Sequence, residues 1–353
     1  MSGLTTGPQQ SPIPASPALS RIGAVPGEGV DAAVASHYGD PVREQRLLVE
    51  GLASVDLSHR GVVTVTGPDR LRWLHSMTTQ HLSELAPGQS TEALVLSPKG
   101  HIEHALHVVD DGATTWLTVE PGSAPALVTW LDSMRFMLDV QVADRTQEYA
   151  VIGEPVGRPG ADGEPPTWVD SWPTLGPDTA AYAGADPHPG AGRAWREVLV
   201  PRTALAAQLE GRELAGMWAA EALRVAAWRP RLGFETDHRT LVHEVDWLRT
   251  AVHLHKGCYR GQETVARVHN LGRPPRRLVF LHLDGSGHVL PQVGSSVVRE
   301  DRPIGQLTSV ARHQELGPIA LAIIKRSVPV ADVLTVISDG GSIAAAPTVI
   351  VDP

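Results

Sequence analysis

Cys258 is the only cysteine in the chain, and its neighbours are of the types that make a thiol reactive. Lys256 and Arg260 bring two positive charges within two residues of it, and nearby cations favour the nucleophilic thiolate. Gly257 and Gly261 allow the backbone to turn tightly and to approach a ligand closely. The alternative is an inert structural cysteine, because free cysteine is among the residue types most often buried.

Gln262 and Glu263 follow directly and add an amide and a carboxylate, which could orient a substrate or accept a proton. The loop is expected to follow a helix, because Lys256-Gly257 ends the helical pattern before it. No metal site is predicted, since one cysteine and scattered histidines form neither a CxxC nor an HxxxH pattern.

The net charge of the chain is −9, which argues against general coating of nucleic acid. The charge is uneven, because residues 224–277 hold eleven Lys or Arg against five acids, together with five histidines. Such a basic block indicates either a specific anionic ligand or RNA contact, or else a solvated arginine-rich face. Charge alone leaves both interpretations open.

The composition predicts a globular protein of two or three domains, with 353 residues of which 42% are apolar. A single cysteine cannot form an internal disulfide. Residues 1–35 are rich in Pro, Ser, Gly and Ala, which predicts a disordered tail and not an export signal. No apolar run approaches the roughly 20 residues that cross a bilayer, so we expect a cytoplasmic protein without membrane contact.

The elements that must position these residues follow from hydrophobic periodicity. Short turns separate the strands of an expected antiparallel meander, and helical spacing indicates helices beside it, so the N-terminal half is predicted to be α+β. Strands are expected at 61–67, 91–97, 101–110 and 114–119, and helices at 68–77 and 124–136.

The second half divides differently. Residues 155–194 are crowded with Pro, Gly and Asp and predict an irregular connection. A helix is expected at 214–228, with Trp218 on its core-facing stripe, and another at 243–254. After Pro274-Pro275 a string of short apolar strands predicts a small β-barrel.

Residues 256–263, KGCYRGQE, resemble the K-G-C-Y-x-G-Q-E signature of the YgfZ family and match all seven specified positions. The similarity extends over most of residues 36–353, including the segments GPDRLRWLHSMTTQ and GQLTSVAR. Members of that family bind folate, act in iron–sulfur protein assembly or repair, and are paralogues of the aminomethyltransferase, or T-protein, of the glycine cleavage system. The resemblance implies an α+β, T-protein-like fold, with three subdomains in a ring around a central tetrahydrofolate channel and a C-terminal small β-barrel.

The resemblance and the texture of the chain together divide it into five parts. These are a disordered tail (1–35), an N-terminal α+β folate-binding-type region (36–154), the Pro/Gly-rich connection (155–194), a second α+β region with the KGCYRGQE motif (195–273) and the barrel (274–353).

Two departures from the T-protein pattern bear on activity. Where T-proteins carry a pair of aspartates on an early strand, this chain has His104-Ala105, so glycine cleavage activity is not expected. In the L-R-x-E-A-G stretch of T-proteins a glutamate pairs with N–H groups of the pterin, and Ala226 stands at that position here. Losing such a charged acceptor typically costs about 1.5–3 kcal/mol, unless Glu221, Glu235 or Glu244 reaches the same place.

Further residues are candidates for a folate site. Trp228 could stack on a pterin or belong to the core, and Arg229 and Arg231 could bind a glutamyl tail or lie on the surface. Glu244 could face the channel or cap a helix, and polar Thr79 could line the channel mouth. The folate-binding candidates are therefore Trp228, Arg231, Glu244, Thr79 and His104, whose imidazole could move protons.

The resulting hypothesis is a tetrahydrofolate-binding protein that supports iron–sulfur enzymes, tRNA-modifying ones among them, through a reactive Cys258. Lys256, Tyr259, Gln262 and Glu263 are expected to position this thiolate, with Gly257 and Gly261 shaping the backbone. The expected partners are iron–sulfur client proteins, with tRNA or tRNA-modifying enzymes as further candidates, and the expected state is a monomer. The alternatives are a folate-dependent aminomethyl transferase or demethylase, and a tRNA-binding scaffold.

Overall fold

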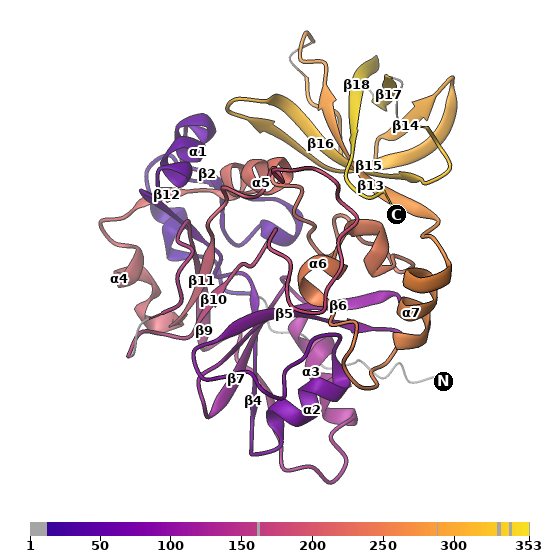
Figure 1. Cartoon of the computed structure of the whole chain (residues 1–353). Coiled ribbons are helices and arrows are strands. Elements are labelled where there is room, and N and C mark those ends of the chain that lie inside the picture. Colours follow the sequence, from indigo (N-terminus) through magenta and orange to yellow (C-terminus); the bar gives the residue numbers. More distant parts are fainter. Residues whose placement is uncertain (1–12, 161–162, 288, 330–332, 339–340, 353) are drawn as a thin grey trace, which may run out of the picture.

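Two five-stranded sheets and one closed barrel surround the centre of the molecule (Figure 1). The structure is a computed structural model that describes residues 13–160, 163–287, 289–329, 333–338 and 341–352. The two sheets lie in the lower and left parts of Figure 1, and the barrel lies above them. The α+β architecture with a C-terminal barrel is therefore confirmed.

The first sheet is the meander expected from the sequence, with strand order β5-β6-β7-β4-β8. Helices α2 (Arg70–Met77) and α3 (Ala124–Ser133) cover one of its faces, and their apolar stripes meet the inward residues of the strands. Its strands are β4 (Gly61–Thr66), β5 (Ser90–Leu96), β6 (Ile102–Asp110), β7 (Thr114–Val119) and β8 (Gln141–Asp144). In β4, Val63 and Val65 face this helical layer while Val62 faces the second sheet, so both faces of the strand are buried.

The second sheet has the strand order β10-β11-β9-β3-β12, and only its β3–β12 pair is parallel among the pairings of the described residues. Helices α1 (Pro41–Val49) and α5 (Met217–Ala226) pack on it through Leu48 and Ala219. Its strands are β3 (Ala53–Asp56), β9 (Tyr149–Glu154), β10 (Thr167–Val169), β11 (Arg196–Pro201) and β12 (Glu213–Ala215), and α4 (Leu205–Leu209) packs near its edge.

The barrel closes in the order β13-β16-β15-β14-β17-β18. Alternate residues such as Val279 and Leu281 point into its own core. On the opposite side, Leu278 and Phe280 join the central core. Its strands are β13 (Arg276–Leu283), β14 (Ser296–Arg299), β15 (Arg302–His313), β16 (Gly317–Lys325), β17 (Leu334–Ser338) and β18 (Gly341–Val349).

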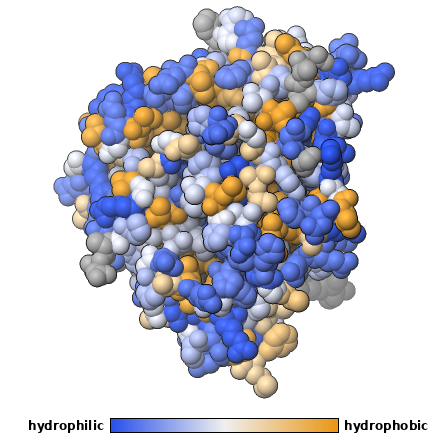
Figure 2. All heavy atoms as spheres, viewed as in Figure 1, coloured by the Kyte–Doolittle hydropathy of each residue, from blue (hydrophilic) through white to orange (hydrophobic). Residues whose placement is uncertain are grey.

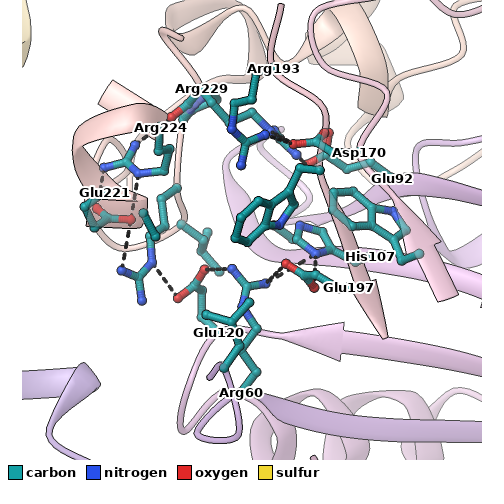
Figure 3. A pocket seen from close by; sticks show the side chains of 18 of the residues that line it. Arg60, Glu92, His107, Glu120, Asp170, Arg193, Glu197, Glu221, Arg224 and Arg229 are labelled. Carbon is teal, nitrogen blue, oxygen red and sulfur yellow. Dashed lines mark hydrogen bonds and ion pairs between the residues drawn. The ribbon is translucent and has the colours of Figure 1, made fainter. Parts of the chain in front are cut away.

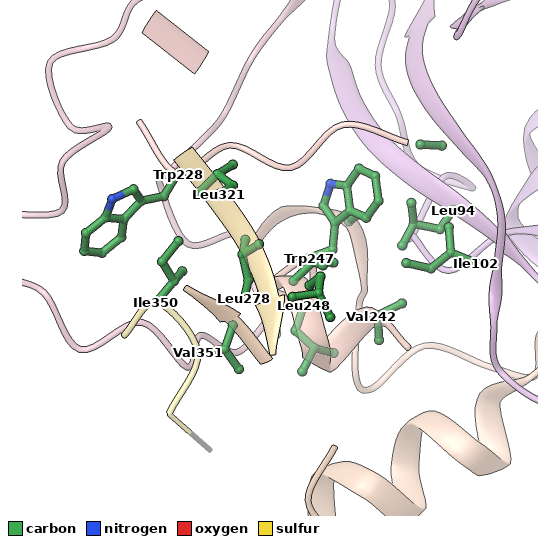
Figure 4. Close-up of a cluster of buried hydrophobic side chains, with 14 of the residues drawn as sticks. Leu94, Ile102, Trp228, Val242, Trp247, Leu248, Leu278, Leu321, Ile350 and Val351 are labelled. Atoms are coloured by element: carbon green, nitrogen blue, oxygen red, sulfur yellow. The ribbon is translucent and has the colours of Figure 1, made fainter. Parts of the chain in front are cut away.

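The central core joins the barrel to the first sheet (Figure 4). Leu94 and Ile102 come from the first sheet, Leu278 and Leu321 from the barrel, and Trp247 lies between them. The connecting segments are η4 (Val242–Val245), α6 (Leu248–Ala251) and α7 (Gln262–Leu271). These short helices carry the KGCYRGQE loop, so the loop is attached to the packed interior.

The structure corrects the extent of the disordered tail expected over residues 1–35. Residues 1–12 lie outside the described part, but residues 13–35 pack against the body of the molecule. They form η1 (Pro17–Ser20), β1 (Val25–Pro26) and η2 (Gly29–Asp31), and β2 (Ala35–His37) follows. Small apolar anchors such as Ala18 and Val34 are buried, and a composition rich in Pro and Gly conceals such isolated anchors.

Two further expectations need correction. The connection 155–194 contains strand β10, whose Trp168 is buried, so part of it belongs to the second sheet. The helix expected over 243–254 is split into η4 and α6, because Asp246 between them adopts a left-handed backbone with φ of 56°.

Trp218 also departs from its expected position in the core. Its side chain is 58% exposed, since α5 begins at Met217 and adjacent helical residues point about 100° apart.

The visible surface is mostly hydrophilic, with apolar side chains scattered over it (Figure 2). Among the described residues, no helix is long and apolar enough to span a membrane.

Candidate functional site

The KGCYRGQE loop presents its cysteine to solvent. Cys258 is exposed, and α7 begins four residues later at Gln262. Gly261 precedes the helix with φ of 84°, a left-handed backbone that glycine adopts without steric cost. The loop therefore places one accessible sulfur directly before a helix.

Lys256 points away from that surface and anchors the loop. Its side chain is buried, and Nζ donates hydrogen bonds to the carbonyls of His75, Thr78 (2.6 Å) and Gln80 (2.9 Å). Burial lowers the pKa of Lys256 to about 7, whereas three carbonyl acceptors favour the ammonium, which has three N–H donors. All three hydrogens are thus committed to the end of α2, and the expected activation of Cys258 by this ammonium needs correction.

The other residues of the motif also fix the loop. Arg260 forms an ion pair with Glu103 at 3.0 Å. Tyr259 is buried in the central core, and Gln262 Nε2 donates to the Lys256 carbonyl at 3.4 Å. Glu263 is exposed on the first turn of α7. The exposure of the sulfur agrees with a reactive thiol, but both flanking cations have other partners.

A second candidate site lies at the centre of the molecule, between the two sheets and α5 (Figure 3). Its walls carry five arginines and five acidic residues, so their charges balance. The arginines are Arg60, Arg193, Arg224, Arg229 and Arg231, and the acids are Glu92, Glu120, Asp170, Glu197 and Glu221. We call this hollow the central pocket.

Ion pairs run around the central pocket and fix its side chains. Arg60 lies 3.4 Å from both Glu120 and Glu197, and His107 Nδ1 lies 2.9 Å from Glu197. Burial alone would raise the pKa of Glu197. Arg60 and His107 lower this pKa by more than burial raises it, so the pKa lies well below the usual range for a glutamate. Arg224 closes another side through Glu221 at 2.8 Å.

Aromatic rings form the flat parts of the wall. The His107 imidazole stacks on Trp168 with ring centroids 3.6 Å apart and planes 5° from parallel. Trp168 Nε1 donates to the Thr91 carbonyl at 2.8 Å, and Trp247 Nε1 donates to Glu92 at 2.9 Å. With their polar atoms satisfied inside the protein, these buried indoles contribute apolar surface to the wall.

Arg229 differs from the other described residues of this wall. Nη2 donates to Glu92 at 2.7 Å and Nε to Asp170 at 3.3 Å, and the guanidinium lies over Trp172 at 5.3 Å. Nη1 has no hydrogen-bond partner among the described residues, although the residue is only 4% exposed. A buried donor without an acceptor costs roughly 1–3 kcal/mol, so this nitrogen is suited to an acceptor from a ligand.

The structure distributes the expected folate residues differently from the sequence analysis. Arg231 lines the central pocket, but Asp31, Glu120 and Glu221 lie within ion-pair distance of its three nitrogens. Trp228 is buried in the central core instead, 6.1 Å from Phe280 by ring centroids.

Glu244 and Thr79 have structural partners. Glu244 is fully buried and forms an ion pair with Arg276 at 2.7 Å. Thr79 Oγ1 donates to the Ala251 carbonyl at 2.6 Å and accepts from the Leu94 amide at 2.9 Å. Both side chains thus hold the connecting segments together, which corrects their expected place at the channel.

His104 lies on the wrong face of β6 for the central pocket. It pairs with Val95, whose side chain belongs to the helical layer of the first sheet, and its pKa is lowered to about 4 by burial. Ala105 and His107 line the pocket instead, as the alternation of a strand requires. Neither His104 nor Ala105 therefore supplies an ionisable group to the pocket.

Of the three glutamates considered as replacements at Ala226, one lines the central pocket. Glu221 lies in its wall, whereas Glu235 pairs with Arg224 at 2.9 Å and accepts from Thr308 of the barrel. Ala226 itself lines a neighbouring hollow.

The basic block of residues 224–277 turns largely inward. Arg276 pairs with Asp237 and Glu244 at 2.7 Å each, and Arg249 pairs with Asp246 at 2.8 Å. The buried cations of the block are Arg224, Arg229, Arg231, Arg249, Lys256 and Arg277. Much of the local positive charge is therefore matched inside the protein.

Sequence reasoning did not identify Glu92, His107 or Asp170 as wall residues of the central pocket. Asp170 lies in the stretch expected to be an irregular connection. The triplet Thr167–Val169 before it has high β-propensity and was the available signal for a strand there.

Comparisons with known proteins agree with this architecture. Residues 18–153 match the GCVT N-terminal domain. A putative chloroplastic transferase of Arabidopsis thaliana is 28% identical over 302 residues, which span 78% of this chain and 66% of that protein. The aminomethyltransferase of Herpetosiphon aurantiacus is 27% identical over 310 residues, 82% of each chain.

A solved structure extends the comparison to the whole fold. The glycine cleavage system aminomethyltransferase T of Bartonella henselae superposes with a TM-score of 0.72 at 19% identity, covering 93% of this chain and 94% of that one. The chain has an aminomethyltransferase-like fold. The narrower resemblance to the YgfZ family stays a prediction.

Proposed function

We propose that the chain is a tetrahydrofolate-binding protein that supports iron–sulfur enzymes, tRNA-modifying ones among them, through Cys258. The observation that carries the proposal is the exposure of this sulfur on a firmly anchored loop. Lys256 and Tyr259 are buried beneath it, so the loop has a fixed base while the thiol faces solvent. A metal or cysteine of a client protein can reach such a thiol.

The motif residues support the thiol by position. Lys256 ties the loop to the end of α2, Tyr259 packs in the central core, and Gln262 bridges back to the loop backbone. Their contribution is therefore to hold Cys258 at the surface, and Glu263 is the exposed carboxylate beside it.

The proposed ligand of the central pocket is a reduced folate. Its wall combines the apolar indoles of Trp168 and Trp247 with Nη1 of Arg229, which has no acceptor among the described residues. A bound tetrahydrofolate supplies one-carbon chemistry, and the residues of this chain would hold and orient its ring. The aminomethyltransferases among the relatives make this the favoured ligand class.

The function of Cys258 is testable in a strain that lacks this protein. The Cys258→Ala variant is expected not to restore the activity of a [4Fe–4S] enzyme, measured in extracts against the wild-type protein. The purified variant should keep the wild-type melting temperature and folate affinity, because Cys258 is exposed and lies outside the wall of the central pocket. Full restoration by the alanine variant would contradict the proposal.

A folate-dependent aminomethyl transferase or demethylase is the second candidate. The names of the relatives and the shared fold favour it. The observation that weighs against it is Ala105, which faces the pocket where a working carboxylate would be needed. Release of formaldehyde or formation of methylene-tetrahydrofolate from an N-methyl or aminomethyl donor would establish this activity.

The same proposal includes that the protein is a monomer and acts on client proteins in the cytoplasm. A tRNA scaffold has weaker support, because much of the basic block is buried and ion-paired. The support for it that remains is Arg267 and Arg273, which are exposed near the end of α7.

A further inference from the structure

Arg229 is a buried cation with spare hydrogen-bonding capacity. Its charge is balanced by Glu92, which forms an ion pair with Nη2, and by Asp170, which forms one with Nε. Nη1 carries two further hydrogens and has no acceptor among the described residues.

The neighbouring Arg231 shows that full satisfaction is possible in this loop. Its three nitrogens lie 3.4 Å or less from carboxylates of Asp31, Glu120 and Glu221. Both arginines line the central pocket and are 4% exposed. The difference between them is therefore specific to Arg229 and does not follow from the loop as a whole.

The backbone before Arg229 is held in an unusual conformation. Trp228 has φ of 57°, a left-handed value that is a genuine outlier for a bulky residue. Such conformations persist where the surroundings over-determine them, and they concentrate at ligand sites. Here the buried indole of Trp228 is fixed in the central core, which sets the direction of Arg229.

The charge balance selects a neutral acceptor for Nη1. The wall already carries equal numbers of arginines and acids, so a carboxylate would add an unmatched buried charge. A ring carbonyl accepts a hydrogen bond without adding charge. The same pocket is lined by Trp168 and Trp247, and aromatic side chains are common partners of the planar heterocycles that bear such a carbonyl.

We infer that Arg229 donates through Nη1 to the 4-oxo carbonyl of the pterin ring and so selects 4-oxo over 4-amino pteridines. The inference rests on the proposed folate binding and assigns one determinant of it. Recognition would have the opposite polarity to that implied by the resemblance, where a glutamate accepts from ring N–H groups.

The test compares two ligands that differ at the C4 position of the ring. The full-length protein is titrated with tetrahydrofolate and with its 4-amino analogue, and binding is read by tryptophan fluorescence and calorimetry. We expect the wild-type protein to bind the 4-oxo ligand about 10- to 100-fold more tightly, because an amino group meets Nη1 as donor against donor. Arg229→Lys keeps a cation beside Glu92 and Asp170 but removes Nη1, so it should lose most of this preference.

Arg196→Lys is the matched control. Arg196 is also largely buried, and its Nη1 has no hydrogen-bond partner in the described part of the chain, but it pairs with Glu154 outside the central pocket. This variant should keep the wild-type preference between the two ligands. Equal binding of both ligands by the wild-type protein would overturn the inference, as would an unchanged preference in Arg229→Lys.

Two further arms separate the possible failures. A tetrahydropterin without the p-aminobenzoylglutamate tail should show the same Arg229 dependence as tetrahydrofolate. If binding of p-aminobenzoylglutamate depends on Arg229 and binding of the tetrahydropterin does not, Nη1 binds the tail carboxylate and the inference is overturned. If the wild-type protein binds neither folate nor pterin, the proposed function fails together with the inference, whereas binding without discrimination overturns the inference alone.

Discussion

At the scale of single residues, Lys256 is a structural cation whose partners are all backbone carbonyls. Replacing it by methionine keeps a long unbranched side chain but leaves the carbonyls of His75, Thr78 and Gln80 without their donor. We expect Lys256→Met to lower the free energy of unfolding by about 2–4 kcal/mol, since each unmet buried acceptor costs roughly 1–3 kcal/mol and water repairs part of the loss. Urea denaturation followed by fluorescence measures this change.

Lys99→Met is the control for that experiment, because Lys99 is exposed in the turn between β5 and β6. It should unfold at the wild-type urea concentration. Equal stability of Lys256→Met and wild type would show that Lys256 does not anchor the loop.

The direction of Lys256 could not be read from the sequence. Adjacency to Cys258 suggested that the ammonium acts on the thiol, but a four-carbon stem can carry the charge either way. The decisive factor is the carbonyl-rich end of α2, more than 170 residues earlier in the chain. Only the folded structure brings that acceptor group to the loop.

At the scale of elements, Gly261 controls how α7 meets the β5–β6 turn. A side chain there would place a Cβ 2.7 Å from the Ser97 carbonyl oxygen and 3.0 Å from Gly100 Cα. Gly261→Ala should therefore destabilise the protein by at least about 1–2 kcal/mol, since the left-handed backbone alone costs that much for alanine. The measurement is the melting temperature together with the urea midpoint.

Gly257→Ala is the natural comparison within the same motif. A Cβ at Gly257 meets no atom of the described residues within 4 Å, and its φ lies outside the left-handed region. This variant should melt within a few degrees of wild type. A destabilisation equal to that of Gly261→Ala would contradict the steric argument.

The regular elements were largely predictable, because periodicity records which face of a strand or helix is buried. The meander of the first sheet and the barrel follow from such patterns. Strand β10 was not predicted from periodicity, because three residues between Pro- and Gly-rich segments are too few to show an alternating pattern. The division of the helix expected over 243–254 depends on the left-handed backbone of Asp246. Aspartate can adopt this conformation, but its presence in a sequence does not predict it.

At the scale of the whole molecule, buried and half-buried neutral histidines make stability depend on pH. Burial lowers the pKa of His104, His188 and His243 to about 4 from an ordinary value of 6.5. Between these values the unfolded chain binds more protons than the folded one, so the free energy of unfolding falls as the pH is lowered from about 6.5 to about 4. Thermal unfolding across this range measures the slope.

His243→Leu should flatten that slope, because His243 is fully buried and its ring nitrogens have no hydrogen-bond partners among the described residues. His238→Leu replaces an exposed histidine and serves as the control. An identical slope in wild type and His243→Leu would exclude His243 as a contributor.

The central pocket itself could not be assembled from sequence. Arg229, Glu92 and Asp170 come from segments separated by 59 residues or more, and Asp31, the partner of the wall residue Arg231, comes from the segment expected to be disordered. Composition identified a local excess of arginine but not the carboxylates that face it. Electrostatic matching across the fold is a property of the three-dimensional arrangement.

Because the chain has a single sulfhydryl, and that group faces outward, oxidation cannot form a disulfide within the chain. Any disulfide it forms joins two molecules, either two copies or this protein and another. This chain therefore offers a single site for attaching one dye or spin label, and a covalent adduct trapped at Cys258 would identify the protein that reacted with it.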